Sequence, residues 1–108
     1  MATCFNFIRK SSHLMKYYLI DTDLSVTPYE GDEEAWMALW PGICWDCVDL
    51  PKGDLIHCDD EGLYRPELKL ASIADQLLPL PLIVTGSQGE RYTSPAHSVE
   101  EIKAMLAG

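Results

Sequence analysis

The chain has 108 residues, of which 47% are hydrophobic and 23% are charged, and its formal net charge at pH 7 is −9. These totals predict one soluble globular domain whose core needs no metal or disulfide for support. Residues 1–16 hold three of the eight basic residues and none of the 17 acidic ones, so residues 17–108 carry a net charge of −12. Such a surface repels phosphate groups, which argues against direct binding of nucleic acid or of an anionic membrane.

Residues 1–14 differ from the remainder in charge and pattern, so we expect an N-terminal extension followed by a single domain over residues 15–108. The extension lacks a secretory signal and the apolar run of about 20 residues that a membrane span needs. We expect it to be disordered or loosely docked rather than an ordered strand. The four cysteines are then expected to be reduced thiols in a cytoplasmic protein.

Two short strands are predicted at the start of the domain. Residues 17–20 are rich in β-forming side chains, and residues 24–27 alternate apolar with polar side chains. Asp21, Thr22 and Asp23 form the turn between them. We expect the second strand to pair with the first and to end at Pro28.

A helix is predicted from the cap at Asp32 to about Trp40. Glu33 and Glu34 fill its first turn, where the helix dipole favours negative charge. Trp36 shares one face with Trp40 at helical spacing, and this face is expected to pack on a sheet.

Residues 42–64 read as one β-hairpin. Residues 43–50 and 55–58 supply its strands, and the turn between them is Pro51-Lys52-Gly53-Asp54, in which proline presets φ and glycine allows a positive φ. A second, acidic turn follows at residues 59–62. This hairpin holds three of the four cysteines and one of the three histidines, so it is where metal or redox chemistry would be visible.

The last third of the chain is predicted to contain two helices and a buried strand. Leu70, Ile73 and Leu77 fit a short helix within residues 65–78. The unbroken apolar run at residues 82–85 favours a central strand, residues 86–90 a turn, and residues 91–93 an edge strand. Ser98 and Glu101 form a capping box, so the final helix begins there and presents residues such as Ile102 to the core.

These elements predict an α+β domain. We expect a mainly antiparallel sheet of about five or six short strands, with two or three helices on one face.

The cysteine and histidine pattern does not favour a zinc site. Cys44 and Cys47 are separated by two residues and Cys58 follows His57, a spacing that invites zinc. Successive side chains of a strand point to opposite faces, however, so at most one residue of each pair can meet across the hairpin. A thioredoxin-type redox pair also fits poorly, because acidic neighbours oppose thiolate formation.

No other pattern carries catalytic chemistry. The acidic turn at residues 59–62 lacks the alternate spacing of a calcium loop, and residues 86–89 lack the lysine and the following helix of a phosphate loop. His13, His57 and His97 have no local partners that would make a nucleophile and base. We therefore predict a protein that is not an enzyme and that uses no metal or cofactor.

A series of short motifs occurs in a fixed order across residues 15–106. They are an opening Met15-Lys16 strand, an acidic helix at residues 32–36, the turn at 57–63, the apolar segment 81–86, and Thr93-Ser94 followed by Ser98 to Glu101. In this order they resemble a family of small uncharacterised domains encoded by bacteriophages, conjugative elements and their bacterial hosts. The chain departs from that family at Pro66-Glu67-Leu68, where relatives tend to have Pro-x-Asn. The resemblance implies a mobile-element setting and supplies no catalytic residues.

We predict an acidic binding protein of phage or mobile-element origin that inhibits or modulates a host protein by docking on its basic surface. The residues expected to form the acidic face are Asp32, Glu33, Glu34, Asp59, Asp60 and Glu61. The alternative is a small-ligand binder for a nucleotide or metabolite, whose pocket between helices and sheet is lined by Trp36, Trp40, Trp45 and Tyr64. A homo-oligomer that pairs the edge strand at residues 91–93 across a two-fold axis is compatible with either.

Overall fold

The computed structural model describes residues 14–39, 45–61, 66, 68–89 and 91–107. The strands are β1 (Met15–Ile20), β2 (Val26–Gly31), β3 (Trp45–Asp49), β4 (Asp54–Asp59), β5 (Leu70–Ile73), β6 (Gln76–Pro79), β7 (Leu82–Gln88), β8 (Arg91–Thr93) and β9 (Leu106–Ala107). The helices are α1 (Glu33–Met37) and α2 (Val99–Met105), and a 3₁₀ turn, η1 (Pro51–Gly53), joins β3 to β4. The predicted extension at residues 1–14 falls almost wholly outside the described residues.

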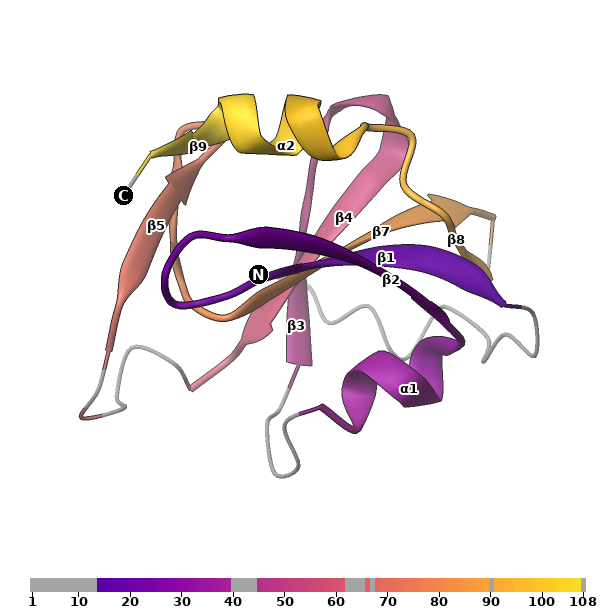
Figure 1. Cartoon of the computed structure of the whole chain (residues 1–108), viewed down its shortest axis with the longest axis horizontal. Helices are drawn as coiled ribbons and strands as arrows, with labels where there is room; N and C mark the ends of the chain where they lie inside the picture. Colours follow the sequence, from indigo (N-terminus) through magenta and orange to yellow (C-terminus); the bar gives the residue numbers. More distant parts are fainter. Residues whose placement is uncertain (1–13, 40–44, 62–65, 67, 90, 108) are drawn as a thin grey trace.

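The described strands form two antiparallel sheets (Figure 1). The main sheet has the order β2-β1-β7-β4-β3, and β8 pairs with β7 beyond the end of β1. The second sheet has the order β6-β5-β9. The mainly antiparallel α+β class is therefore confirmed, although the strands are divided between two sheets.

Strand β7 lies at the centre of the main sheet. It pairs with β1 along one edge and with β4 along the other, and Leu82, Ile83, Val84 and Thr85 are all fully buried. The prediction of a central strand here is confirmed. The strand continues to Gln88, through residues that were expected to turn.

The hairpin predicted within residues 42–64 is present as β3 and β4, an antiparallel pair in which Cys47 lies opposite His57. Residues 42–44 and 62–64 lie outside the described residues. As expected from strand alternation, His57 and Cys58 lie on opposite faces: His57 contacts Trp36, whereas Cys58 packs in the cluster that contains Ile56.

Strand β2 does not end at Pro28. It runs on to Gly31, with Pro28 opposite Tyr18 of β1. Because β2 is the edge of the sheet, proline removes no hydrogen bond that a further strand needs, so the strand can pass through it.

The helix predicted within residues 65–78 is wrong. The chain forms the hairpin β5–β6 instead, in which Leu70 lies opposite Pro79. Ala74 and Asp75 have φ values of 49° and 64°, which is the left-handed conformation of a two-residue hairpin turn. Leu70, Ile73 and Leu77 satisfy helical spacing by coincidence, and burial of Ala71 and Ile73 against the core selects the strand.

The two faces of the main sheet carry separate hydrophobic clusters. One face is covered by the second sheet and α2, and we call it the second-sheet face; Ile56 and Val84 of the main sheet pack there with Ile73 of β5 and Ile102 of α2. The opposite face is the aromatic face, whose buried side chains include Met15, Tyr17, Leu19, Trp36, Trp45, Leu55, Ile83 and Tyr92.

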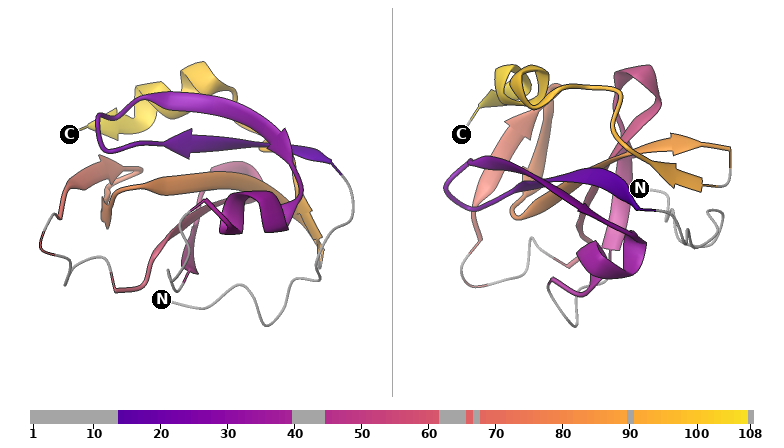
Figure 2. Two further views of the ribbon diagram at one scale, coloured as in Figure 1. Left: turned by 60° about the horizontal axis from the view of Figure 1, so that its bottom comes forward. Right: turned by 45° about the vertical axis from the view of Figure 1, so that its right-hand side comes forward.

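The two described helices contribute to different clusters, α1 through Trp36 and α2 through Ile102, and Figure 2 shows them on opposite sides of the main sheet. The expectation of helices on a single face is therefore not met, because each sheet face has apolar residues that need cover. Both predicted caps are present. Asp32 accepts a hydrogen bond from the amide of Ala35, and Ser98 forms the capping box with Glu101. Helix α1 ends at Met37, earlier than predicted.

Candidate functional site

The two acidic segments predicted to form a binding face lie at the same end of the molecule. The rings of Trp36 in α1 and Trp45 in β3 meet edge to face with centroids 5.5 Å apart. Trp45 in turn lies opposite Asp59, the last residue of β4. This contact packs α1 beside β3; in Figure 1, α1 and the end of β4 both lie in the lower part of the view, to the right and to the left of β3.

The predicted acidic residues differ in exposure. Glu34, Asp60 and Glu61 are exposed, and Asp32 is half-buried with its carboxylate used in capping α1. Asp59 is only 6% exposed, and its carboxylate accepts a hydrogen bond of 3.0 Å from the amide of Glu61. The side chain of Glu33 lies outside the described residues. We call the group of Asp32, Glu34, Asp60 and Glu61 the acidic end.

Of the four aromatic residues predicted to line a ligand pocket, Trp36 and Trp45 are brought together by the fold. They are 0% and 5% exposed and pack in the core of the aromatic face. Trp40 and Tyr64 lie outside the described residues. The contact between the two indoles therefore serves as packing between α1 and the sheet.

His57 is the buried polar centre of the aromatic face. Its ring lies 4.5 Å from the Trp36 ring and 5.2 Å from the Tyr92 ring, measured between centroids. Its Nε2 shares a 2.8 Å hydrogen bond with the Thr85 hydroxyl. Burial lowers the pKa of His57 to about 3, so the imidazole is neutral near pH 7.

Some buried polar atoms on this face have no hydrogen-bond partner in the part of the chain that the structure describes. Two of these are Nδ1 of His57 and the indole Nε1 of Trp36. Both side chains are fully buried, so neither atom is compensated by bulk water. Nothing in the sequence marked His57 for this position.

The cysteines differ from the prediction in part. Cys47 is disulfide-bonded, so the expectation of four reduced thiols is wrong at this residue. Cys58 is buried and forms no disulfide. Burial, reinforced by the Asp46 carboxylate, raises the pKa of Cys58 to about 11, which leaves it a protonated and unreactive thiol. Within the described residues, no group of three or more histidine, cysteine, aspartate and glutamate side chains is placed to hold a metal ion.

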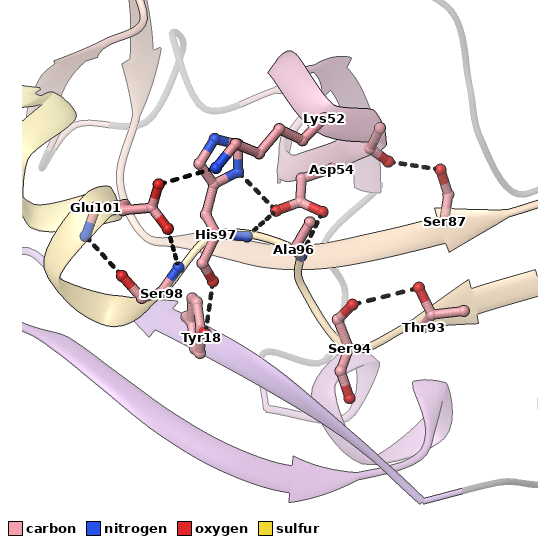
Figure 3. A network of polar contacts seen from close by, with 11 residues as sticks. Tyr18, Lys52, Asp54, Ser87, Thr93, Ser94, Ala96, His97, Ser98 and Glu101 are labelled. Carbon is pink, nitrogen blue, oxygen red and sulfur yellow. Dashed lines mark hydrogen bonds and ion pairs between the residues drawn. The ribbon is translucent and has the colours of Figure 1, made fainter.

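A second polar centre, which sequence reasoning missed, lies on the second-sheet face (Figure 3). The buried carboxylate of Asp54 accepts three hydrogen bonds from the loop before α2. Its Oδ1 accepts one of 2.8 Å from the Ala96 amide, and its Oδ2 accepts one of 2.9 Å from the His97 amide. The third joins Oδ2 to Nδ1 of His97 over 2.7 Å. Asp54 and His97 are 1% and 4% exposed.

This centre extends to β1 and to the capping box of α2. The Tyr18 hydroxyl donates a 2.8 Å hydrogen bond to the carbonyl of His97, and burial raises the pKa of Tyr18 so that it remains a donor. Beside it, Lys52 forms an exposed 3.0 Å ion pair with Glu101. The hydrogen bond from the Ser98 amide, followed by the one from Lys52, lowers the pKa of Glu101 to about 2.

A carboxylate that orients an imidazole is one part of a catalytic triad, but the hydroxyls beside it already have structural roles. The Ser98 hydroxyl accepts a hydrogen bond from the Glu101 amide, and the Ser87 hydroxyl donates one to the Gly53 carbonyl. The arrangement is accounted for by the attachment of the loop before α2 to the start of β4. No local signal links Asp54 to His97, because they are 43 positions apart.

Neither described helix has the length and apolar character needed to cross a bilayer. A scan against protein-family models and searches of curated proteins and of solved structures find no match to this chain. The resemblance to the mobile-element family therefore stays a prediction.

Proposed function

We propose that this protein is a non-enzymatic binding protein that docks its acidic end on a basic surface of another protein. The observation that carries the proposal is that the two acidic segments flank β3 in the lower part of Figure 1, where α1 packs on β3 through the contact between Trp36 and Trp45. Segments that are 25 or more positions apart in the chain therefore leave Glu34 and the pair Asp60-Glu61 exposed on either side of β3.

The physical mechanism is electrostatic steering. A strongly acidic protein attracts a basic partner over distances near the Debye length, roughly 8 Å at physiological salt, and this raises the association rate more than it slows dissociation. Binding should therefore weaken as salt is added. The motif resemblance of residues 15–106 supports a mobile-element setting, in which the target is a host protein whose activity is inhibited or modulated.

The test compares two triple charge reversals of equal net charge. The first places lysine at Glu34, Asp60 and Glu61, and the second places lysine at Asp21, Asp23 and Asp75, which are exposed carboxylates in the β1–β2 and β5–β6 turns. The probe is a lysine-rich basic protein captured by the wild-type chain, and the readout is the association rate constant across a salt titration.

We expect the first variant to associate about tenfold more slowly and to lose most of the salt dependence. The second should change association much less. Equal effects of the two variants would mean that total charge, and no particular end of the molecule, attracts the partner. Unchanged association for the first variant would also overturn the proposal.

A further inference from the structure

A pocket with a volume of about 400 Å³ lies between the β1–β2 ribbon and the start of α2. Its lining residues are Lys16, Tyr18, Pro28, Tyr29, Glu30 and Val99. It shares no lining residue with the acidic end. The inference drawn from it therefore goes beyond the proposed function, and either can fail alone.

The strand register explains why four of these six residues face the same space. Lys16 lies opposite Glu30, and two positions along the same strands Tyr18 lies opposite Pro28. Alternate residues of a strand point to one side, so these four side chains project from one face of the ribbon. Val99, in the first turn of α2, contributes an apolar wall across from them.

The rim of the pocket carries one positive and one negative charge that do not neutralise each other. Lys16 and Glu30 are both exposed, and within the described residues their side chains form no ion pair or hydrogen bond, although they are direct cross-strand partners. Opposite charges at such positions normally attract, since their Cβ atoms are about 5 Å apart. Each charged group is available to a ligand.

The wall of the pocket is fixed before any ligand arrives. Tyr18 is 7% exposed, and its hydroxyl donates a hydrogen bond to the carbonyl of His97. The amide of His97 in turn donates a hydrogen bond to the carboxylate of Asp54. The amide of Lys16 donates a 2.8 Å hydrogen bond to the hydroxyl of Ser94. Because Tyr18 and the backbone of Lys16 are already held in place, ligand binding orders few further protein groups, and this favours affinity.

We propose that this pocket binds a free α-amino acid with an aromatic or large aliphatic side chain. Lys16 pairs with the ligand carboxylate and Glu30 with its ammonium group. The ligand side chain lies over the apolar surface of Tyr18, Pro28 and Val99. A zwitterion matches both rim charges at once, whereas a ligand with a single charge leaves the other rim charge without a partner.

The test uses three ligands that share one ring and differ only in charge. L-Phenylalanine has both charged groups, 3-phenylpropionate lacks the ammonium group, and 2-phenylethylamine lacks the carboxylate. Binding is followed by amide chemical shifts in NMR titrations of the whole chain. We expect saturable shifts at Lys16, Tyr18 and Val99 with L-phenylalanine, and binding about tenfold weaker for each singly charged analogue.

Two substitutions assign the charges separately. Lys16→Gln should weaken L-phenylalanine and 3-phenylpropionate but leave 2-phenylethylamine unchanged, and Glu30→Gln should give the converse pattern. Lys103→Gln and Glu100→Gln are matched controls, because they remove one charge of each sign from exposed positions of α2 outside the pocket lining. They should leave all three affinities unchanged.

Three results would overturn the proposal: no saturable shift with L-phenylalanine or L-leucine at millimolar concentration, equal binding of a singly charged analogue, or equal effects of the control substitutions. Each would show that the two rim charges do not act together on one ligand. None of them bears on the acidic end, whose charge reversals leave Lys16 and Glu30 in place.

Discussion

Buried polar side chains serve different purposes on the two faces of the main sheet. On the second-sheet face, the carboxylate of Asp54 accepts three hydrogen bonds and holds the loop that begins α2. On the aromatic face, His57 has one hydrogen bond, to Thr85, and its Nδ1 has no partner in the described part of the chain. On the second-sheet face a buried carboxylate positions the backbone of a loop, whereas on the aromatic face a neutral imidazole packs among aromatic rings.

Burial alone therefore does not reveal what a polar residue contributes to stability. A fully hydrogen-bonded carboxylate is costly to replace, because its donors lose their acceptor together. An imidazole that is held mainly by ring contacts is costly to protonate. Three substitutions and one change of pH test this comparison, and they follow from the largest expected loss of stability to the smallest.

Truncation of the aromatic face at Trp36 should give the largest loss. Trp36→Ala empties a fully buried indole site, and we expect the free energy of unfolding to fall by about 4 kcal/mol in urea denaturation. Trp36→Phe keeps most of the ring contacts and deletes the N–H that has no hydrogen-bond partner among the described residues. It should cost less than half as much; an equal loss would reveal an acceptor for that N–H.

Removal of the buried charge on the second-sheet face should cost about 3 kcal/mol. Asp54→Asn keeps the shape of the side chain but turns an NH₂ group toward donors that the carboxylate now satisfies, including the amide of His97. Thermal and urea denaturation measure the loss. The matched control is Asp75→Asn, an exposed aspartate in the β5–β6 turn, which should stay within about 0.5 kcal/mol of the wild type.

Acidification should destabilise the protein through His57. Its pKa is about 3 when folded and near 6.5, the ordinary value for histidine, when unfolded, so the contribution of the neutral ring is complete above pH 6.5. Below pH 6.5 the unfolded chain takes up a proton that the folded chain does not. Stability should fall by about 1.4 kcal/mol per pH unit toward the folded pKa.

The measurement for His57 is the free energy of unfolding between pH 7 and pH 5, where the expected loss is about 2 kcal/mol, compared between the wild type and His57→Gln. The variant cannot titrate at this position, so its pH dependence should be shallower across the same range. Parallel curves would show that other groups cause the acid sensitivity.

Loss of the α2 cap should give the smallest effect. Ser98→Ala removes the hydroxyl that accepts a hydrogen bond from the Glu101 amide, and we expect a loss of about 0.5–1 kcal/mol. Ser98→Gly, which also lacks the hydroxyl but is a tolerated cap, should lose less. A loss from Ser98→Ala as large as that from Asp54→Asn would mean that the cap, and not the buried carboxylate, fixes this loop.

Features of the fold that depend on adjacent residues were predictable from the sequence. Asp32 and Ser98 cap helices through neighbours three positions away, and the buried run that begins at Leu82 is central because it has no polar face. The segment around Ala74 was not predictable, because its apolar spacing fits either a helix or a hairpin. Contacts with the remainder of the core decide between them.

The candidate site was predictable as a set of charges but not as an arrangement. The carboxylates at Glu34 and Asp60 are visible in the sequence, whereas the packing of α1 beside β3 depends on the ring contact between Trp36 and Trp45. The pairing of Asp54 with His97 depends on the long-range route of the chain, which no local pattern encodes. Only the capping box next to His97 indicated that the loop had a defined end.

The position of β7 has a consequence for how the chain assembles. Among the described residues, the hairpins β1–β2 and β3–β4 form no ladder with each other, and both form backbone pairs with β7, which begins at Leu82. Until that strand is in place, both hairpins expose an unsatisfied edge, and two-stranded ribbons alone are marginal in water. A nascent chain that stalls before Leu82 would therefore be prone to self-association, and the rate of folding should follow the docking of this single late segment.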